Sequence, residues 1–220
     1  MSAPLSARYR LLAVVADTIN CRIRSIGINA APVSTLAGSY CGSYADGTGT
    51  NAVIGNVGGP AYFPNFGTPI VFFPAYGNRI SAAFADSGVT FSVAGGMGAG
   101  TADGVGTVAK FNSPTGVCIS DYYGDNVLYV ADYNNGLIRK MPLTSVYPGY
   151  SGTVPPLTVS TIAGGGGSGT VYTPSADGDG TSATFGKPTG CTAYSNYLYV
   201  TDKNFNVIRR INLASHTHSL

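Results

Sequence analysis

The sequence predicts an all-β fold made of tandem four-stranded units, and three observations support this prediction. Segments of similar sequence recur in the same order along the chain. Each segment alternates short apolar runs with turns rich in Gly and Asn. Glycine (31) and tyrosine (15) are abundant, while tryptophan is absent. Many Val, Ile, Thr and Tyr residues favour strands, and abundant glycine favours tight turns over helices.

The clearest repeat consists of two strands joined by a turn. It occurs as LLAVVADTINCRIRSI, NVLYVADYNNGLIRKM and NYLYVTDKNFNVIRRI. In each copy an apolar strand ends at an aspartate, a turn rich in Asn and Gly follows, and the next strand carries an Ile-Arg pair. This arrangement predicts a hairpin. The aspartates are Asp17, Asp132 and Asp202, and the arginines are Arg24, Arg139 and Arg209.

Two further elements complete the unit. Short strands ending in glycine (VSTLAG, FSVAGG, VSTIAG) precede the loops ADGTGTNAVI, ADGVGTVAKF and ADGDGTSATF, which contain Asp46, Asp103 and Asp177. The segments SPTGV and KPTGC then begin a new strand. Four antiparallel strands followed by a crossing loop are typical of a β-propeller blade, which is stabilised by stacking on its neighbours.

These motifs, ADGxGxxAxFxxPxGV, LYVADxxNxxIRK and VxTxAG, resemble the NHL repeat over roughly Leu11 to Leu213. The resemblance implies an NHL-like β-propeller over 1–213, with units at about 1–43, 44–100, 101–167 and 168–213 and a C-terminal tail at 214–220.

The four predicted units are unequal. The second lacks the motif residues: aligned without gaps, Ala75 takes the place of Asp132, and Ala82-Ala83 take the place of Arg139-Lys140. The third contains an insertion at Thr144–Leu157. The fourth ends after its third strand, so the last blade is predicted to be incomplete. An unpaired sheet edge can template pairing with another molecule.

The recurring acidic residues are interpreted as structural. Asp17, Asp132 and Asp202 occur once per blade, so each is expected to cap the turn after its strand through backbone N–H groups rather than to form a catalytic or metal cluster. The ADG aspartates are interpreted as turn residues rather than calcium ligands, because Pro188 stands where an EF-hand requires its last ligand.

The sequence gives no support for catalysis or a cofactor. His216 and His218, the only histidines, lie in the tail. The amidating-lyase propellers that resemble this repeat use a histidine cluster around a metal, and Ser-His-Asp catalysis also needs a histidine. Gly164–Gly169 is interpreted as a blade connection, because no Gly-Lys-Ser/Thr follows. We therefore expect no enzyme, metal or cofactor site.

RNA binding is an alternative, because RNA-binding NHL domains use a basic face. The basic residues that recur on the third strands are Arg22, Arg24, Arg139, Lys140, Arg209 and Arg210. They can equally be solvent-facing strand residues or contacts between blades. A net charge of only +2 without a like-charge run argues against nucleic acid. No apolar stretch is long enough for a transmembrane helix.

The four cysteines form no CxxC pair, which argues against structural zinc. Cys21 lies in a turn and Cys41 in a loop that leave a blade on the same face, so a Cys21–Cys41 disulfide is geometrically possible and would imply an oxidising compartment. Cys118 and Cys191 occupy near-equivalent first-strand positions and are interpreted as buried thiols.

The sequence therefore predicts a non-catalytic structural or protein-interaction scaffold, extracellular or on a cell surface. Its partner would be another protein or copies of itself, with self-association into a fibre as one form. An RNA-binding module and a propeller lyase or hydrolase are the alternatives.

Overall fold

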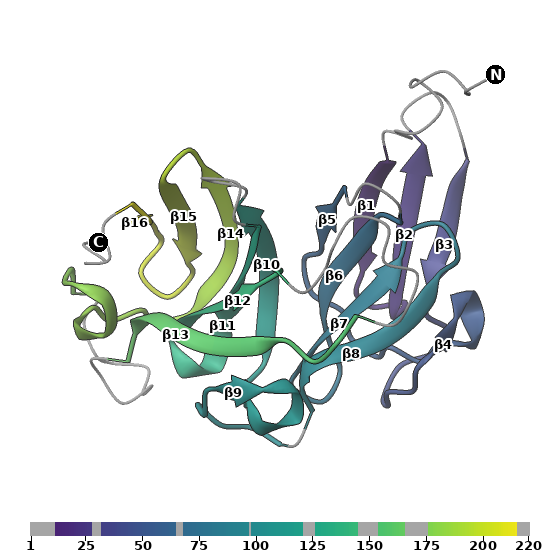
Figure 1. The fold of residues 1–220 in the computed structure, drawn as a ribbon, viewed down its shortest axis with the longest axis horizontal. Helices are drawn as coiled ribbons and strands as arrows, with labels where there is room; N and C mark the ends of the chain where they lie inside the picture. The colour runs from purple at the N-terminus through teal and green to yellow at the C-terminus, as the bar shows by residue number, and fades with distance from the viewer. Residues whose placement is uncertain are drawn as a thin grey trace.

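The computed structural model describes residues 12–27, 32–64, 68–96, 98–120, 126–144, 154–165 and 176–214. These residues form four antiparallel sheets, which follow one another as the blades of a β-propeller (Figure 1). The predicted all-β propeller fold is confirmed. The short helical turns that the structure describes are 3-10 turns of three residues: η2 (Gly49–Asn51), η3 (Gly106–Val108), η5 (Tyr133–Asn135) and η6 (Gly180–Ser182).

Blades 1 and 4 each show three strands in chain order. Blade 1 contains β1 (Leu12–Asp17), β2 (Arg22–Gly27) and β3 (Val33–Ala37). Blade 4 contains β14 (Pro188–Tyr194), β15 (Tyr197–Asp202) and β16 (Val207–Asn212).

Blades 2 and 3 are five-stranded, because each gains a two-residue strand from an ADG loop. In blade 2, β4 pairs with β8, and in blade 3, β9 pairs with β13. The loop thus runs along the outer edge of the blade before the chain enters its innermost strand. The strands of blade 2 are β4 (Gly47–Thr48), β5 (Ala61–Phe63), β6 (Ile70–Ala75), β7 (Arg79–Phe84) and β8 (Val89–Gly95). Those of blade 3 are β9 (Gly104–Val105), β10 (Pro114–Ser120), β11 (Val127–Asp132), β12 (Leu137–Pro142) and β13 (Thr158–Gly164).

The hairpin turns share one backbone feature. The third strand of the predicted four-stranded unit is β2, β7, β12 or β16 in blades 1 to 4. The residue just before each of these strands has a positive φ, in the left-handed region that favours Gly and Asn. The four residues are Cys21 (φ 53), Asn78 (φ 58), Gly136 (φ 62) and Asn206 (φ 55). The Asn- and Gly-rich turns of the sequence supply this conformation in three blades, and a cysteine supplies it in blade 1.

Three apolar cores lie between the blades. One joins blades 1 and 2 through Ile23 and Phe73, the next joins blades 2 and 3 through Ile80 and Val130, and the third joins blades 3 and 4. Blades 1 and 4 lie at opposite sides of the molecule (Figure 1), and their described strands do not pack as neighbouring blades do. The arc of blades is therefore open between them.

The innermost strands approach one another closely around the axis. Gly59 and Gly116 form a parallel bridge, with Gly59 N–H donating to Thr115 O at 2.8 Å. The Thr115 hydroxyl in turn donates to Thr189 O at 2.9 Å. A Cβ on Gly116 would lie 2.6 Å from Thr189 O, so the glycine of the Pro-Thr-Gly motif permits this approach.

The pairing of blade 2 corrects the ungapped alignment of its sequence. Its hairpin turn is one residue shorter, because Ala75 pairs with Arg79 whereas Asp132 pairs with Leu137. Ser81 therefore occupies the position of Arg139, and Ala82 that of Lys140. The expectation that Ala82 and Ala83 stand at these positions is wrong by one residue.

Candidate interaction surface

The repeated arginine of blade 3 is a buried clamp. The Arg139 side chain is fully buried and donates to Asp132 Oδ2 at 2.9 Å and to Asp103 Oδ1 at 2.7 Å. It also donates to the carbonyl oxygens of Lys110 and Ala102, both at 2.9 Å. One guanidinium thus holds the end of β11 and both ends of the ADG loop in place.

Blade 4 repeats this arrangement around Arg209. Its guanidinium donates to Asp177 Oδ1 at 2.6 Å and to the carbonyl oxygens of Thr184 and Ala176, both at 3.0 Å. It also lies over the Phe185 ring, as Arg139 lies over Phe111. The aspartates of the ADG loops are therefore ligands of the third-strand arginines in blades 3 and 4, a role beyond the turn function expected from the sequence.

The strand-end aspartates bind a different loop from the expected one. Asp132 accepts a hydrogen bond from the Asn112 N–H at 2.8 Å, and Asp202 accepts from the N–H groups of Gly186 (2.8 Å) and Lys187 (2.9 Å). These donors precede the innermost strand of the same blade. The prediction that the carboxylates cap the following turn through its backbone N–H groups is wrong, because the loop before the first strand returns to the same end of the blade.

Blade 2 replaces the arginine with a tyrosine from another element. The Tyr44 hydroxyl donates to Asp46 Oδ1 at 2.8 Å and accepts from the buried Ser81 hydroxyl at 3.1 Å. Burial raises the pKa of Tyr44, and the neighbouring Asp46 adds to the shift. Arg79 stacks on the same ring, 3.9 Å from its centroid. Asp46 thus keeps a hydrogen-bonding side-chain partner although this blade lacks the arginine.

The corresponding pair in blade 1 is partly open to solvent. Arg24 Nε donates to Asp17 Oδ2 at 3.1 Å, and Arg24 NH1 donates to the Thr35 hydroxyl at 2.6 Å. A hydrogen bond from Asn20, followed by those from Arg24, lowers the pKa of Asp17.

The basic residues of the third strands do not form one basic face. Arg139 and Arg209 are buried and bound to carboxylates. Only the other positions of the set, such as Arg210, reach solvent. Of the two interpretations left open by the sequence, that of solvent-facing strand residues does not hold for Arg139 and Arg209, whose side chains are buried.

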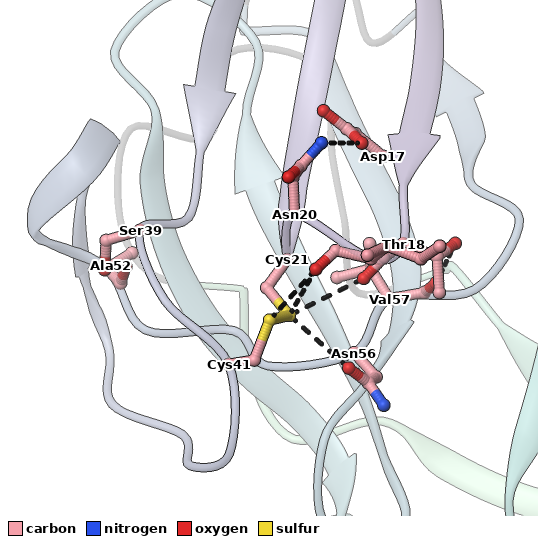
Figure 2. Close-up of a disulfide and its surroundings, with 10 residues drawn as sticks. Asp17, Thr18, Asn20, Cys21, Ser39, Cys41, Ala52, Asn56 and Val57 are labelled. Atoms are coloured by element: carbon pink, nitrogen blue, oxygen red, sulfur yellow. Dashed lines mark hydrogen bonds between the residues drawn. A yellow bond between two sulfur atoms is a disulfide. The ribbon is translucent and has the colours of Figure 1, made fainter.

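A disulfide joins Cys21 to Cys41, with the two Cα atoms 5.4 Å apart (Figure 2). Cys21 lies in the hairpin turn of blade 1 and Cys41 in the loop after β3. The Thr18 hydroxyl in the same turn donates to Val57 O at 2.9 Å, which ties the turn to the chain entering blade 2. The disulfide and this hydrogen bond together fasten the rim of blade 1.

A second disulfide joins Cys118 to Cys191, with the Cα atoms 5.7 Å apart. The interpretation of these residues as buried thiols is wrong. They lie on the innermost strands of adjacent blades, where β10 and β14 pack side by side and the two side chains meet. Disulfides persist in oxidising compartments and are rare in the reducing cytosol, so two disulfides indicate a non-cytosolic chain.

The outward side of blade 4 is uncovered. Ile208 and Ile138 occupy the same third-strand position, yet Ile208 is 73% exposed and Ile138 is 0% exposed. On the innermost strand β14, Tyr194 is 76% exposed where its equivalent in blade 3, Ser120, is buried. Blade 3 is covered here by blade 4, whereas blade 4 presents the same side to solvent.

An open groove of about 630 Å³ lies on this side of blade 4. Beside it, Arg210 stacks over the Tyr197 ring, 4.6 Å from its centroid. Tyrosine and arginine are enriched in protein interfaces. We call this side of β14, β15 and β16 the blade 4 face. The groove is lined by Gly190, Cys191, Thr192, Tyr194, Tyr199, Thr201 and Ile208.

Several sequence features lie outside the described residues. They include His216 and His218, most of the insertion at Thr144–Leu157, and the part of Gly164–Gly169 from Gly166 onward. Within the described ranges, no helix is long and apolar enough to cross a membrane. In the same part of the chain, no group of three or more His, Cys, Asp or Glu side chains is placed to hold a metal ion.

Comparison with known proteins gives matches in sequence and in fold. No family model matches the chain. "NHL repeat-containing protein 2" from Bos taurus is 36% identical over 102 residues, which cover 46% of this chain and 12% of the relative. The chain therefore matches about an eighth of that relative's length.

Two solved structures share the fold. An auxiliary nutrient binding protein from Bacteroides ovatus has a TM-score of 0.63 at 18% identity, covering 92% of this chain and 46% of its own. An auxiliary nutrient binding protein from Bacteroides thetaiotaomicron has a TM-score of 0.58 at 17% identity, and the match covers 90% of this chain and 44% of that protein.

Fold and motifs together define the chain as a β-propeller protein whose blades are joined by ADG loops and clamped by buried polar groups. The resemblance of its repeats to the NHL repeat, predicted from the sequence, agrees with the partial match to NHL repeat-containing protein 2.

Proposed function

We propose that the chain is a non-catalytic scaffold outside the cytosol that binds a protein partner through the blade 4 face. The observation that carries the proposal is the exposure of Ile208, at a position that is fully buried in the other three blades. Monomeric proteins rarely expose contiguous apolar surface of this kind, and such patches mark interaction sites.

The repeated carboxylates support a structural rather than a catalytic role. Asp132 is buried and bound to Arg139, Asn112 and Asn135, and Asp103 is bound to Arg139 and Thr161. Groups held in this way stabilise the blades. RNA binding is less well supported, since two of the six basic residues that would form its face are buried in these clamps.

The two disulfides support an extracellular or cell-surface location. Peptide mapping of the secreted chain without reductant is expected to recover Cys21 linked to Cys41 and Cys118 linked to Cys191. Four alkylatable thiols in the secreted chain would contradict this location.

The interaction is tested by photocrosslinking in the cells that produce the chain. p-Benzoylphenylalanine in place of Tyr194 lies on the blade 4 face. The same residue in place of Tyr76 is the matched control, since Tyr76 is 45% exposed in the turn between β6 and β7 of blade 2. We expect covalent protein adducts at position 194 and none at position 76. No adduct at 194, or equal labelling at both positions, would contradict the proposal.

A further inference from the structure

The three contacts between blades follow one pattern on the side that faces the next blade. An isoleucine at the start of each third strand projects into the core that the next blade completes. Ile23, Ile80 and Ile138 are all fully buried there. Ile208 holds the same position in blade 4, but it is 73% exposed, and no blade among the described residues packs over it. The blade 4 face therefore has the residue positions of a blade–blade contact, without the second half of that contact.

The opposite side of each blade supplies that second half. The second strand of the predicted unit is β1, β6, β11 or β15 in blades 1 to 4. On it, an apolar residue that pairs with the arginine position of the third strand packs against the preceding blade. It is Phe73, Val130 or Val200 in blades 2, 3 and 4, and all three are fully buried. Val15 is the equivalent in blade 1, paired with Arg24, and it is 43% exposed. Exposed Val33 lies on the same side, on the outermost strand.

From these two exposed faces we infer that the blade 4 face docks on blade 1 of a second copy of this chain. The inference rests on the proposed function, because it names the protein that occupies the same surface. The contact continues the three interfaces already inside the molecule. Ile208 of one copy takes the place that Ile138 has between blades 3 and 4, and Val15 of the other copy takes the place of Val200.

A second copy fits this surface because, inside the molecule, the equivalent side of blades 1, 2 and 3 packs against the next blade. In blades 2, 3 and 4 the side that packs against the preceding blade is buried. Within the described part of the chain, blade 1 alone exposes this side, and it is the surface that a blade 4 face would contact. The contact is head-to-tail, so two copies that close on each other form a ring of eight blades, within the four to eight blades typical of propellers. Copies that do not close form a filament.

Sedimentation velocity of the purified full chain over a dilution series into the micromolar range tests the contact. The wild-type chain is expected to reach the mass of two or more copies. Ile208→Lys and Val15→Lys each place an ammonium group at the centre of the contact and should weaken association by about a hundredfold or more. Val108→Lys is the matched control: Val108 is 65% exposed in η3, away from both end faces, and association should be unchanged.

Mixing the variants separates a head-to-tail contact from other arrangements. Each single variant should be monomeric, but an equimolar mixture should form a heterodimer, because Ile208→Lys retains blade 1 and Val15→Lys retains the blade 4 face. Thermal unfolding must show that both variants stay folded, as expected for exposed positions. A dimer or a filament that follows this pattern supports the inference.

Two results would overturn the inference. Wild-type chain that stays monomeric at every concentration excludes the second copy. Val15→Lys that associates like wild type excludes blade 1 as the docking site. Adducts at position 194 with a different protein, together with a monomeric purified chain, would leave the proposed function in place and remove only the second copy.

Discussion

Arg139 NH1 lies 2.9 Å from Asp132 Oδ2, and both side chains are fully inaccessible to solvent. Burial raises the pKa of Asp132, and the hydrogen bonds from Asn112, Asn135 and Arg139 act against that shift. The carboxylate therefore depends on its donors, and the guanidinium also holds the ADG loop through Asp103. Removing the Arg139 guanidinium therefore leaves the Asp132 carboxylate buried without its counter-charge.

We expect Arg139→Met to lower the free energy of unfolding by about 3–5 kcal/mol, the cost of breaking a buried pair by removing one partner. The adjacent Lys140→Met is the control, because Lys140 is only half-buried and forms no ion pair in the described structure; its effect should stay below about 1 kcal/mol. Urea unfolding of both variants measures the difference. Equal losses would show that the clamp does not stabilise blade 3.

Blade 2 offers the same test with a neutral group. Tyr44→Phe removes the hydroxyl between Ser81 and Asp46 and leaves the buried Ser81 hydroxyl without that partner, at a cost of about 1–3 kcal/mol. The double variant Tyr44→Phe/Ser81→Ala should cost less than the sum of the single variants, since the two hydroxyls form one network. Tyr40→Phe, on an exposed loop, is the control and should be nearly neutral. Strict additivity in thermal unfolding would argue against the network.

The innermost strands give a prediction about close backbone approach. Gly116→Ala places a Cβ 2.6 Å from Thr189 O and 3.2 Å from Gly190 Cα, so the backbone of β10 or β14 must shift. We expect a loss of about 1–3 kcal/mol in the free energy of unfolding. Gly59→Ala is the matched control, because Gly59 bridges to Gly116 and its Cβ would find its nearest atom at 3.8 Å. A Gly59→Ala variant as unstable as Gly116→Ala would contradict the steric argument.

The fold was predictable because each blade repeats the same local pattern. A strand ending in Asp, an Asn- or Gly-rich turn and a strand carrying Ile-Arg define a hairpin with no reference to the rest of the chain. The ADG loop between one outer strand and the next inner strand identifies the blade as part of a propeller.

Contacts between elements were not predictable in the same way. Tyr44 takes over the arginine role from 37 residues before Ser81, in a loop that carries no hairpin motif. The Cys118–Cys191 disulfide requires that equivalent positions of neighbouring inner strands face each other, which no single repeat shows. The exposure of Ile208 could not be predicted from the motif either, because Ile138 occupies the same motif position and is buried.

The two disulfides close loops of different length, and this sets their relative stabilisation. Cys21 and Cys41 are 20 residues apart, and Cys118 and Cys191 are 73 apart. Loop-closure entropy of the unfolded chain gives about 3 kcal/mol for the shorter and about 4 kcal/mol for the longer loop. The Cys118→Ala/Cys191→Ala variant should therefore be less stable than Cys21→Ala/Cys41→Ala by about 1 kcal/mol in guanidinium unfolding. The reverse order would mean that native-state packing outweighs loop closure.

Asp103 gives the protein a predictable response to acid. Burial opposes ionisation of Asp103, but hydrogen bonds from the Thr161 N–H, the Arg139 guanidinium and the Thr161 hydroxyl more than offset it, so the pKa of Asp103 is lowered from 3.8. The unfolded chain then binds a proton at this site more readily than the folded chain. The stabilisation from ionised Asp103 is present above about pH 4 and is lost as the pH falls through the lower, folded pKa.

We therefore expect Asp103→Asn to be less stable than wild type at about pH 6, and we expect this gap to narrow as the pH falls below about 4 towards the lowered folded pKa of Asp103, where the wild-type carboxyl becomes neutral. The raised pKa of Asp132 acts with the opposite sign in both proteins, so it largely cancels in the difference between them. Thermal unfolding of the two proteins across this range measures that difference. A stability gap that stays constant down to about pH 3 would show that Asp103 contributes through packing of the ADG loop and not through its charge on Arg139.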